Sequence, residues 1–337
     1  MKATRNLVLI LGAILLLTPG LYAGDSFSKV GTSGAQFLKL GVGARYTALG
    51  DAAVAAVSDG YAMYFNPAAL GALDKSHLEF TNIQWIDGVN LNYFSFAKPT
   101  GFGSIGVSVT ALSSGDIEVT TTEQPNGTGE YYSASSYAIA AGYARRLTDF
   151  FSVGVNAKYI TEKISEERAS GIAFDFGTLL YTGYKSLRIG MSISNLGPEM
   201  SFTGPELNFN YNPAPNNESY DPAQGVLSVD SYDLPLMFRI GVAYDIQYSE
   251  DTRMTLVLET RDPTDNEQQG AIGTELALGE TFFLRGGWKF NCAEENLTLG
   301  GGINLAVWEA TDLALNYAWA DFGRLSSVHR FSLGFRF

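Results

Sequence analysis

The chain has 337 residues, of which 46% are hydrophobic and only 17% are charged, with 37 glycines, 18 tyrosines and 21 phenylalanines. Its formal net charge of −13 excludes a nucleic-acid partner that is held by a basic surface. An aromatic, glycine-rich and charge-poor composition is typical of membrane strands joined by tight turns.

Residues 1–23 predict a cleaved secretory signal peptide. A basic start and an apolar run over residues 7–17 precede a cleavage position at Ala23, and cleavage there changes the formal charge to −15. The run is shorter than the roughly 20 apolar residues of a membrane helix, and no later stretch approaches that length. Cys292 is the only cysteine, so disulfides give an exported chain no support. A mature protein that enters a membrane therefore does so as a barrel.

Residues 24–76 are predicted to form a compact, partly helical hatch. The part from Gly31 to Gly71 is rich in Ala and Gly and lacks the alternation of strands. Residues 46–57 have a helix-like composition, and Asn66-Pro67 supplies an N-cap and a first-turn proline for another short helix. A soluble cap or a linker is the alternative. The even strand number derived below favours a plug, because both ends of such a barrel lie on the periplasmic side, close to the mouth of the lumen.

From residue 77 to the C-terminus, period-two alternation predicts strands with one apolar and one polar face. Around residue 155, for example, Val153, Val155 and Tyr159 share one face, whereas Asn156 and Lys158 lie on the other. We predict about fourteen strands, at 77–86, 89–97, 102–112, 134–145, 150–164, 169–182, 185–196, 235–247, 252–261, 269–278, 281–290, 296–307, 310–320 and 326–337. An even number of segments of this length indicates a closed antiparallel transmembrane β-barrel over residues 77–337, an all-β membrane protein.

The connections between these strands alternate in length. Short turns such as 98–101 and 278–280 contrast with long external loops at 113–133 and 197–234, as in outer-membrane barrels. Aromatic residues near strand ends, such as Tyr143, Trp288 and Phe322, predict interfacial girdles. A secreted, non-membrane β-protein is the alternative, but a sandwich has no reason to alternate its loops in this way.

The last strand, HRFSLGFRF, places Phe335 and the terminal Phe337 on its apolar face. It resembles the C-terminal signal by which outer-membrane barrels are recognised for assembly. This predicts the barrel-assembly machinery and outer-membrane lipid as partners.

The charged residues on the polar strand faces are expected to point into the lumen, where buried charges need partners in the hatch, Asp51 among them, or in the wall. They are Lys158, Asp175, Arg188, Arg239, Asp245, Glu259, Arg261, Arg285, Lys289, Arg330 and Arg336. Hatch anchoring and a cargo path are the two interpretations. A shift of the apolar phase near Asn82 predicts a bulge, and with it a candidate lateral gate; ordinary barrel curvature is the alternative.

Signals for catalysis are absent from the sequence. His77 and His329 are the only histidines and lie at opposite ends of the barrel region, so neither a metal cluster nor a His-based triad has its parts. Asp262, Asp265 and Glu267 form an acidic loop without calcium-loop spacing, which predicts a solvated turn. We expect no enzyme, no cofactor and no metal.

The hatch segment resembles a known family in the run GTSGAQFLKLGVGARYTALGDAAVAAVSDGYAMYFNPAALG, especially at Gly43-Ala44-Arg45 and Phe65-Asn66-Pro67-Ala68. These residues resemble the N-terminal region of PorV/PorQ-type proteins, which belong with the FadL-like outer-membrane transporters. The resemblance covers about forty residues closely, and the barrel by pattern. It implies a fourteen-stranded barrel with a lumenal hatch that includes Arg45, Asp51, Asn66, Pro67 and Ala68.

The resemblance also implies a function. A PorV-like accessory would handle cargo in type IX-like protein export together with secretion-system components. The wider superfamily implies the alternative, a gated channel for hydrophobic small molecules such as long-chain fatty acids or hydrocarbons. Both place the protein in the outer membrane.

Overall fold

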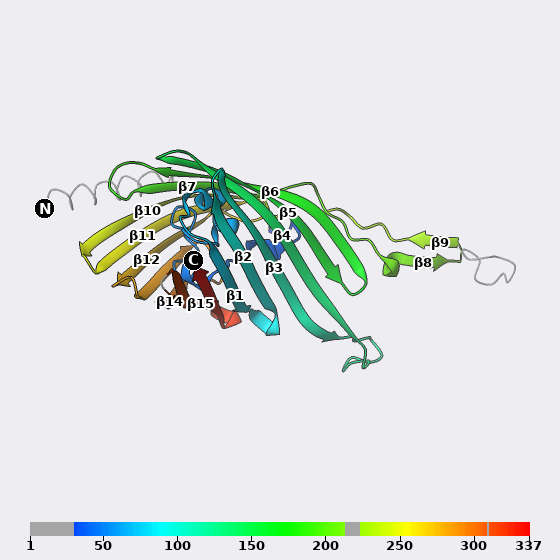
Figure 1. Cartoon of the computed structure of the whole chain (residues 1–337). Helices are drawn as coiled ribbons and strands as arrows, with labels where there is room; N and C mark the ends of the chain where they lie inside the picture. Colours follow the sequence, from blue (N-terminus) through cyan, green and yellow to red (C-terminus); the bar gives the residue numbers. More distant parts are fainter. Residues whose placement is uncertain (1–29, 213–222, 309) are drawn as a thin grey trace, which may run out of the picture.

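The computed structural model describes residues 30–337 except 213–222 and 309, so the predicted signal peptide over residues 1–23 lies outside the described part. Fourteen strands close into one antiparallel barrel in the order β1-β16-β15-β14-β13-β12-β11-β10-β7-β6-β5-β4-β3-β2 (Figure 1). Strands β8 and β9 form a separate two-stranded sheet. The predicted fold class, a fourteen-stranded antiparallel β-barrel behind a short N-terminal helical segment, is confirmed.

The helical turns before the barrel are η1 (Gln36–Lys39), α2 (Ala44–Thr47), α3 (Ala62–Phe65) and η2 (Pro67–Ala72). The later ones are η3 (Ile86–Gly88), η4 (Pro205–Leu207) and η5 (Gly323–Leu325). Within the described residues, no helix has both the length and the apolar character needed to cross a membrane. The strands are β1 (His77–Gln84), β2 (Asn90–Thr100), β3 (Gly103–Glu118), β4 (Tyr131–Thr148), β5 (Phe151–Ile164), β6 (Glu167–Tyr181), β7 (Arg188–Leu196), β8 (Asn208–Tyr211), β9 (Ala223–Val226), β10 (Met237–Ser249), β11 (Thr252–Pro263), β12 (Gln269–Leu278), β13 (Phe282–Phe290), β14 (Leu297–Trp308), β15 (Thr311–Asp321) and β16 (Ser327–Arg336).

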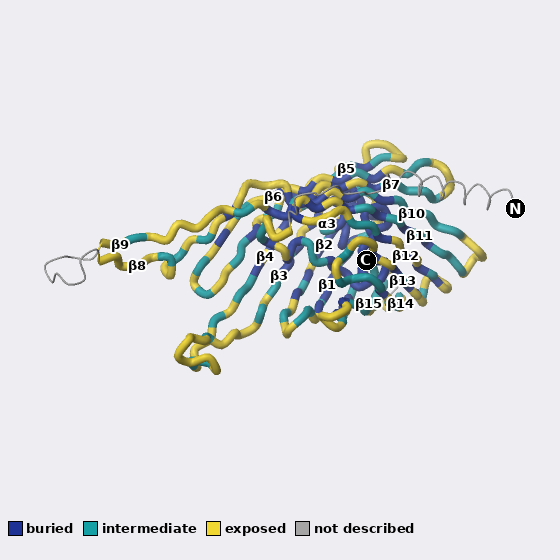
Figure 2. The backbone as a smooth tube through the Cα atoms, turned by 180° about the vertical axis from the view of Figure 1, so that it is seen from behind, coloured by how far each residue is buried: buried dark blue, intermediate teal, exposed yellow. Residues whose placement is uncertain are grey.

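The two faces of the wall differ as a membrane barrel requires. Large apolar side chains such as Ile139, Ile172 and Leu284 are about half exposed on the outer face. Small and polar residues such as Gly154 and Asn156 alternate with them and face the lumen. The buried positions gather at the centre of the molecule, where the hatch lies inside the wall (Figure 2).

The strands are not equally long. The wall reaches furthest at β3 to β6, of which β4 has 18 residues, whereas β1 has only 8. These long strands, with the β8–β9 hairpin beyond them, form an arm at the end where the long loops lie (Figure 1). We call this the long-loop end, and the opposite one the short-turn end. In outer-membrane barrels the long loops face outward and the short turns face the periplasm.

Two predicted loops differ from those of the structure. Strands β3 and β4 pair beyond residue 113, because a register shift between Ser113 and Asp116 absorbs Ser114 and Gly115 and lets the ladder continue. The loop predicted at 113–133 is therefore shorter, at 119–130. The second loop carries the β8–β9 hairpin, which projects away from the barrel rather than over the pore (Figure 1).

Two local predictions are wrong. Residues 46–57 do not form a helix beyond α2, because Gly50 and Asp51 have positive φ values of 73° and 59°. The bulge expected near Asn82 is absent as well, since β1 pairs without a register shift on both sides. The apolar phase changes there because Ile83 turns inward, fully buried against the apolar hatch, while Asn82 stays on the outer face.

Candidate functional site

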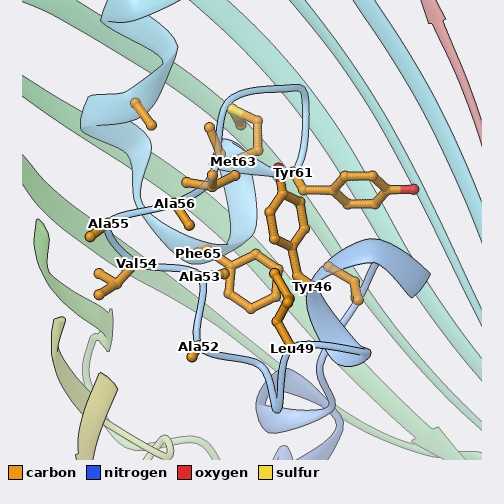
Figure 3. Packing of buried hydrophobic residues seen from close by; sticks show 14 of the residues in the cluster. Tyr46, Leu49, Ala52, Ala53, Val54, Ala55, Ala56, Tyr61, Met63 and Phe65 are labelled. Atoms are coloured by element: carbon orange, nitrogen blue, oxygen red, sulfur yellow. The ribbon is translucent and has the colours of Figure 1, made fainter. Parts of the chain in front are cut away.

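The hatch fills the lumen around an aromatic cluster of Tyr46, Tyr61 and Phe65 (Figure 3). The ring centroids of Tyr46 lie 5.8 Å from Tyr61 and 5.4 Å from Phe65, and Tyr61 stacks on Tyr93 of the wall at 5.6 Å. Edge-to-face and offset pairs of this kind stabilise beyond their buried area. The hatch is therefore packed as a hydrophobic core that continues into the wall.

The wall meets the hatch through inward-facing glycines. A Cβ atom on Gly154 would lie 2.3 Å from the carbonyl carbon of Pro67, and one on Gly190 would lie 2.2 Å from the carbonyl oxygen of Val54. A Cβ atom on Gly287 would lie 2.2 Å from the backbone nitrogen of Gly50. Only glycine fits such backbone-to-backbone contacts. The glycines of the polar strand faces thus form the surface on which the hatch lies.

Three wall carboxylates bind the hatch directly. Glu275 on β12 accepts two hydrogen bonds of 3.0 Å from the Arg45 guanidinium, and a third of 2.7 Å from Arg285 on β13. Glu259 on β11 accepts the backbone N–H groups of residues 53 and 54 at 2.7 and 2.8 Å. Asp265, in the turn between β11 and β12, binds the Lys39 ammonium at 2.8 Å. Each is a charge-assisted contact in a nearly buried position.

Asp51 is the hatch's own buried carboxylate. Its Oδ2 lies 2.5 Å from Lys289 Nζ and 3.8 Å from Arg261 Nη1. Burial alone would raise the pKa of Asp51, but Lys289, Arg261 and Arg330 outweigh it and lower this pKa well below its usual value. The stability that these contacts contribute is therefore present above about pH 4 and is lost as the pH falls through the lowered pKa.

Asn66 connects two parts of the hatch with the wall. Its Oδ1 accepts the backbone N–H of Ala68 at 3.1 Å and caps η2, whose first residue is Pro67. Its Nδ2 donates to the carbonyl oxygens of Val54 at 2.7 Å and of Thr178 on β6 at 3.0 Å. An Asn at this position thus satisfies three backbone groups that burial would otherwise leave without partners.

The other predicted lumen charges lie on the inner face in separate groups. Lys158 is 2.8 Å from Asp175, and Arg188 is 2.9 Å from Asp245. Arg239 is 97% buried, and its guanidinium lies 5.4 Å from the ring centroids of both Tyr64 and Phe65 in the hatch. The pairs Lys158–Asp175 and Arg188–Asp245 join neighbouring strands. Arg239, by contrast, contacts the aromatic rings of the hatch through its guanidinium group.

The start of the hatch lies at the long-loop end. Ser33 pairs with Asp233 of the loop after β7, and Gln36 Nε2 donates to Asp265 Oδ2 at 2.6 Å. Of the acidic loop that was predicted to be a solvated turn, Asp262 and Glu267 are exposed, whereas Asp265 is 97% buried under the hatch. Burial acts to raise the pKa of Asp265, yet hydrogen bonds from Lys39, Ser33 and Gln36 lower it.

Residues 24–217 match the sequence model of the family described as "Type IX secretion system protein PorV", which is more than half of the chain. The chain belongs to the PorV family.

Solved structures share the fold of this PorV-family protein. A CymD monoaromatic hydrocarbon channel is 12% identical with a TM-score of 0.57, and 88% of this chain covers 97% of that one. The toluene transporter TbuX of Ralstonia pickettii is 13% identical with a TM-score of 0.54, over 88% and 98% of the two chains. A FadL homologue of Pseudomonas aeruginosa is 10% identical with a TM-score of 0.50, over 85% and 95%. At such identities the likeness shows the fold alone.

No curated protein matches the sequence in the corresponding comparison. The family match and the shared fold identify this PorV-family protein as a non-enzymatic outer-membrane β-barrel of FadL-like architecture.

The predicted gate residue and the C-terminal phenylalanines of the PorV-family barrel lie outside the surface on which the hatch packs. Asn82 Nδ2 donates to Asn92 Oδ1 at 2.9 Å, and the continuous pairing of β1 gives the candidate gate no strand break. Phe335 and Phe337 flank the seam, where the backbone of Phe337 exchanges bonds of 2.8 and 3.0 Å with Ser76. Phe322 does not belong to an aromatic girdle at the membrane interface, because it is buried. Its ring centroid lies 5.0 Å from that of Trp85.

Sequence reasoning missed two sets of residues at the site. Arg45, Asp51 and the lumen charges were identified, but Glu275 was not, although it lies on the polar face of a predicted strand. The inward glycines were also overlooked. Their signal is glycine that recurs on the polar face of successive strands, as at Gly154 and Gly190, where a water-filled pore would favour polar side chains.

Proposed function

We propose that this PorV-family protein handles secreted cargo at the outer membrane as an accessory of type IX-like protein export. In this proposal the hatch is a fixed plug, and the protein works through the surface of its long-loop end. The signal peptide over residues 1–23 directs the chain across the inner membrane, and the barrel-assembly machinery inserts residues 77–337. Secretion-system components are its expected partners.

The observation that carries the proposal is the closure of the lumen. Among the described residues, cavities of about 110, 20 and 450 Å³ lie between hatch and wall, and these three have no lining residue in common. Between them lie the aromatic cluster and the contacts of Glu275, Glu259 and Asp51. A plug with so many buried charge-assisted bonds favours a role that does not require passage through the barrel.

The arm supplies a surface for partners. Phe209 and Tyr211 of β8 are 42% and 57% exposed, and Val226 of β9 is 68% exposed, on a hairpin that projects beyond the barrel (Figure 1). Exposed apolar residues on a projecting strand pair are typical of protein-binding surfaces.

A channel for hydrophobic small molecules is the second candidate. It is supported by the fold shared with proteins whose titles name a monoaromatic hydrocarbon channel and a toluene transporter. Such a channel would need the hatch to leave its contacts with Glu275 and Glu259.

Gene deletion in the native host distinguishes the two functions. Under the export proposal, deletion removes proteins from the secreted fraction and leaves the uptake of toluene and long-chain fatty acids unchanged. A complementing F209S/Y211S variant should restore barrel levels but not secretion, whereas Tyr248→Ser, a matched exposed tyrosine at the short-turn end, should restore both. An unchanged secreted proteome together with lost hydrocarbon uptake would establish the channel instead.

A further inference from the structure

Strands β4, β5 and β6 lie side by side in the longest part of the wall, and their outer faces carry an apolar belt (Figure 1). On β5 the outward residues are apolar from Phe151 to Tyr159, whereas Thr161 and Lys163 follow on the same face. A strand of nine residues, 151–159, that is tilted by about 40° rises by about 23 Å, close to the roughly 25 Å of the apolar band of outer-membrane barrels. Residues beyond Tyr159 on this face therefore lie at the level of the lipid headgroups at the long-loop end.

Two cations face each other just beyond this belt. Lys163 on β5 and Arg168 on β6 are direct partners in the register of the strand pair. Like charges in this position repel each other and destabilise the pairing of two strands. Among the described residues, no other lysine or arginine lies on an outward strand face at the long-loop end. An anion from outside the chain would relieve the repulsion between the two.

A cavity of about 320 Å³ lies on the outer face around the two cations. Arg168 Nε donates to Thr161 Oγ1 at 2.9 Å, and no carboxylate of the described residues forms an ion pair with this guanidinium. Lys163 Nζ lies 3.6 Å from Glu166 Oε1, in a pair whose side chains are 50% and 66% exposed. One positive charge of the cavity therefore remains uncompensated. The lining residues are Ser135, Tyr137, Thr161, Lys163, Glu166 and Arg168.

The place of the cavity decides which anion fits. A guanidinium matches two oxygens of a phosphate at once, and the hydroxyl groups of Ser135 and Tyr137 add further donors. Directly below the cavity, Ile139, Tyr159 and Ile172 form one row across the three strands and are 56%, 45% and 52% exposed. A lipid whose acyl chains lie along this row brings its phosphate to the level of the cavity, whereas a free anion gains nothing from the belt.

We propose that this cavity on the outer wall binds the phosphate of a membrane lipid in the leaflet at the long-loop end. Arg168 and Lys163 are its charged contacts, and the acyl chains lie on the row of Ile139, Tyr159 and Ile172. The bound lipid holds β4, β5 and β6 at a fixed height in the membrane. The proposal goes beyond the export function and does not rest on it, because the cavity faces lipid whether or not the arm binds cargo.

Native mass spectrometry of the full chain in non-ionic detergent tests the proposal by titration with three compounds. Phosphatidic acid and a diacylglycerol with the same acyl chains differ only in the phosphate, and glycerol 3-phosphate carries the phosphate without the chains. We expect phosphatidic acid to bind about tenfold or more tightly than the diacylglycerol, because each cation near a membrane surface strengthens anion binding by about fivefold. Glycerol 3-phosphate should bind at least about a hundredfold more weakly than phosphatidic acid, since it makes no contact with the belt.

Variants of the two cations locate the site. Arg168→Gln should weaken the binding of phosphatidic acid by about fivefold, and a K163Q/R168Q variant should remove its advantage over the diacylglycerol. Glu166→Gln should strengthen the binding by a similar factor, because it removes the negative charge of the cavity. Arg324→Gln is the matched control and should change nothing, since Arg324 is an 89% exposed arginine at the same end that is paired with Glu294.

Heat-modifiable gel migration reports the folding of each variant, and all four substitutions replace exposed side chains. Equal binding of phosphatidic acid and the diacylglycerol would overturn the proposal. So would an unchanged advantage of phosphatidic acid in the K163Q/R168Q variant. Binding of glycerol 3-phosphate as tight as that of phosphatidic acid would show a site for a free anion in place of a lipid site.

Discussion

Single wall carboxylates hold the hatch in place. Glu275 is hydrogen-bonded to two arginines, Arg45 in the hatch and Arg285 in the wall, and lies 3.6 Å from a third, Arg253; its side chain is 1% exposed. Removal of one member of a buried ion pair leaves the other charge without compensation, which costs more than the pair itself contributes. The effect of a substitution at this residue therefore measures how firmly the hatch is anchored.

We expect Glu275→Gln to destabilise the folded barrel by about 3 kcal/mol and to raise single-channel conductance in planar bilayers. The amide keeps the shape of the side chain but leaves Arg285 without a counter-ion and Arg45 with only Asp59, at 3.8 Å. Glu166→Gln is the control, because Glu166 pairs with Lys163 at the surface with 66% exposure and should change stability by less than about 1 kcal/mol. Equal conductance of both variants would argue against anchoring by Glu275.

The sequence predicted which charges face the lumen but not which of them meet. Alternation places Lys289 and Arg285 on the inner face of β13, and this follows from local pattern alone. Their partners Asp51 and Glu275 depend on barrel register and on the path of the hatch, because Lys289 and Asp51 are 238 positions apart in the sequence. The turn around Asp265 was interpreted as solvated for the same reason, since nothing local indicates that Lys39 covers it.

At the scale of elements, η2 lies on a surface made of glycine. Residues 67–72 contact β4, β5 and β6, and a Cβ atom added to Gly154 on β5 would lie 2.3 Å from the carbonyl carbon of Pro67. A strand with glycine on its inner face loses stability by itself but allows a helix backbone to approach closely. The seat of the hatch is therefore sensitive to the addition of a single carbon atom.

We expect Gly154→Ala to displace η2 and to destabilise the protein by about 1–3 kcal/mol, because the new Cβ atom would meet backbone that cannot rotate away. Limited proteolysis from the short-turn end should then cleave within residues 66–70, which are buried in the unaltered protein. Gly101→Ala, at the β2–β3 turn, has nothing within 4 Å of the new atom and should leave protection unchanged. Identical cleavage of the two variants would contradict a close-packed seat.

Strands with alternating apolar and polar residues could be predicted from the sequence. Segments whose shape depends on tertiary contacts could not. All fourteen barrel strands follow from period two, yet β3 and β4 extend beyond the prediction because a bulge at Ser113 preserves their pairing. Residues 46–57 look helical by composition. Gly50 and Asp51 end the helix instead, and the Asp51 backbone turns so that its carboxylate can reach Lys289.

For the whole molecule, the barrel closes where its two ends meet. β1 pairs with β16 from His77 to Gln84, and Ser76 continues the ladder with Phe337 through two backbone bonds. These bonds need no particular side chain at the last residue. If the final strand is a recognition signal, the aromatic side chain of Phe337 is needed for assembly of the barrel into the membrane rather than for its stability.

The variant Phe337→Ala separates these two roles. The side chain is 49% exposed, and its seam bonds come from the backbone, so the purified and refolded barrel should lose less than about 1 kcal/mol of unfolding free energy. In cells, by contrast, we expect several-fold less heat-modifiable barrel in the outer membrane, because the assembly machinery no longer meets a terminal aromatic. Phe331→Ala is the control, on the same strand and face with 48% exposure, and it should assemble normally. Similar cellular levels of the two variants would show that closure of the barrel does not depend on the terminal side chain.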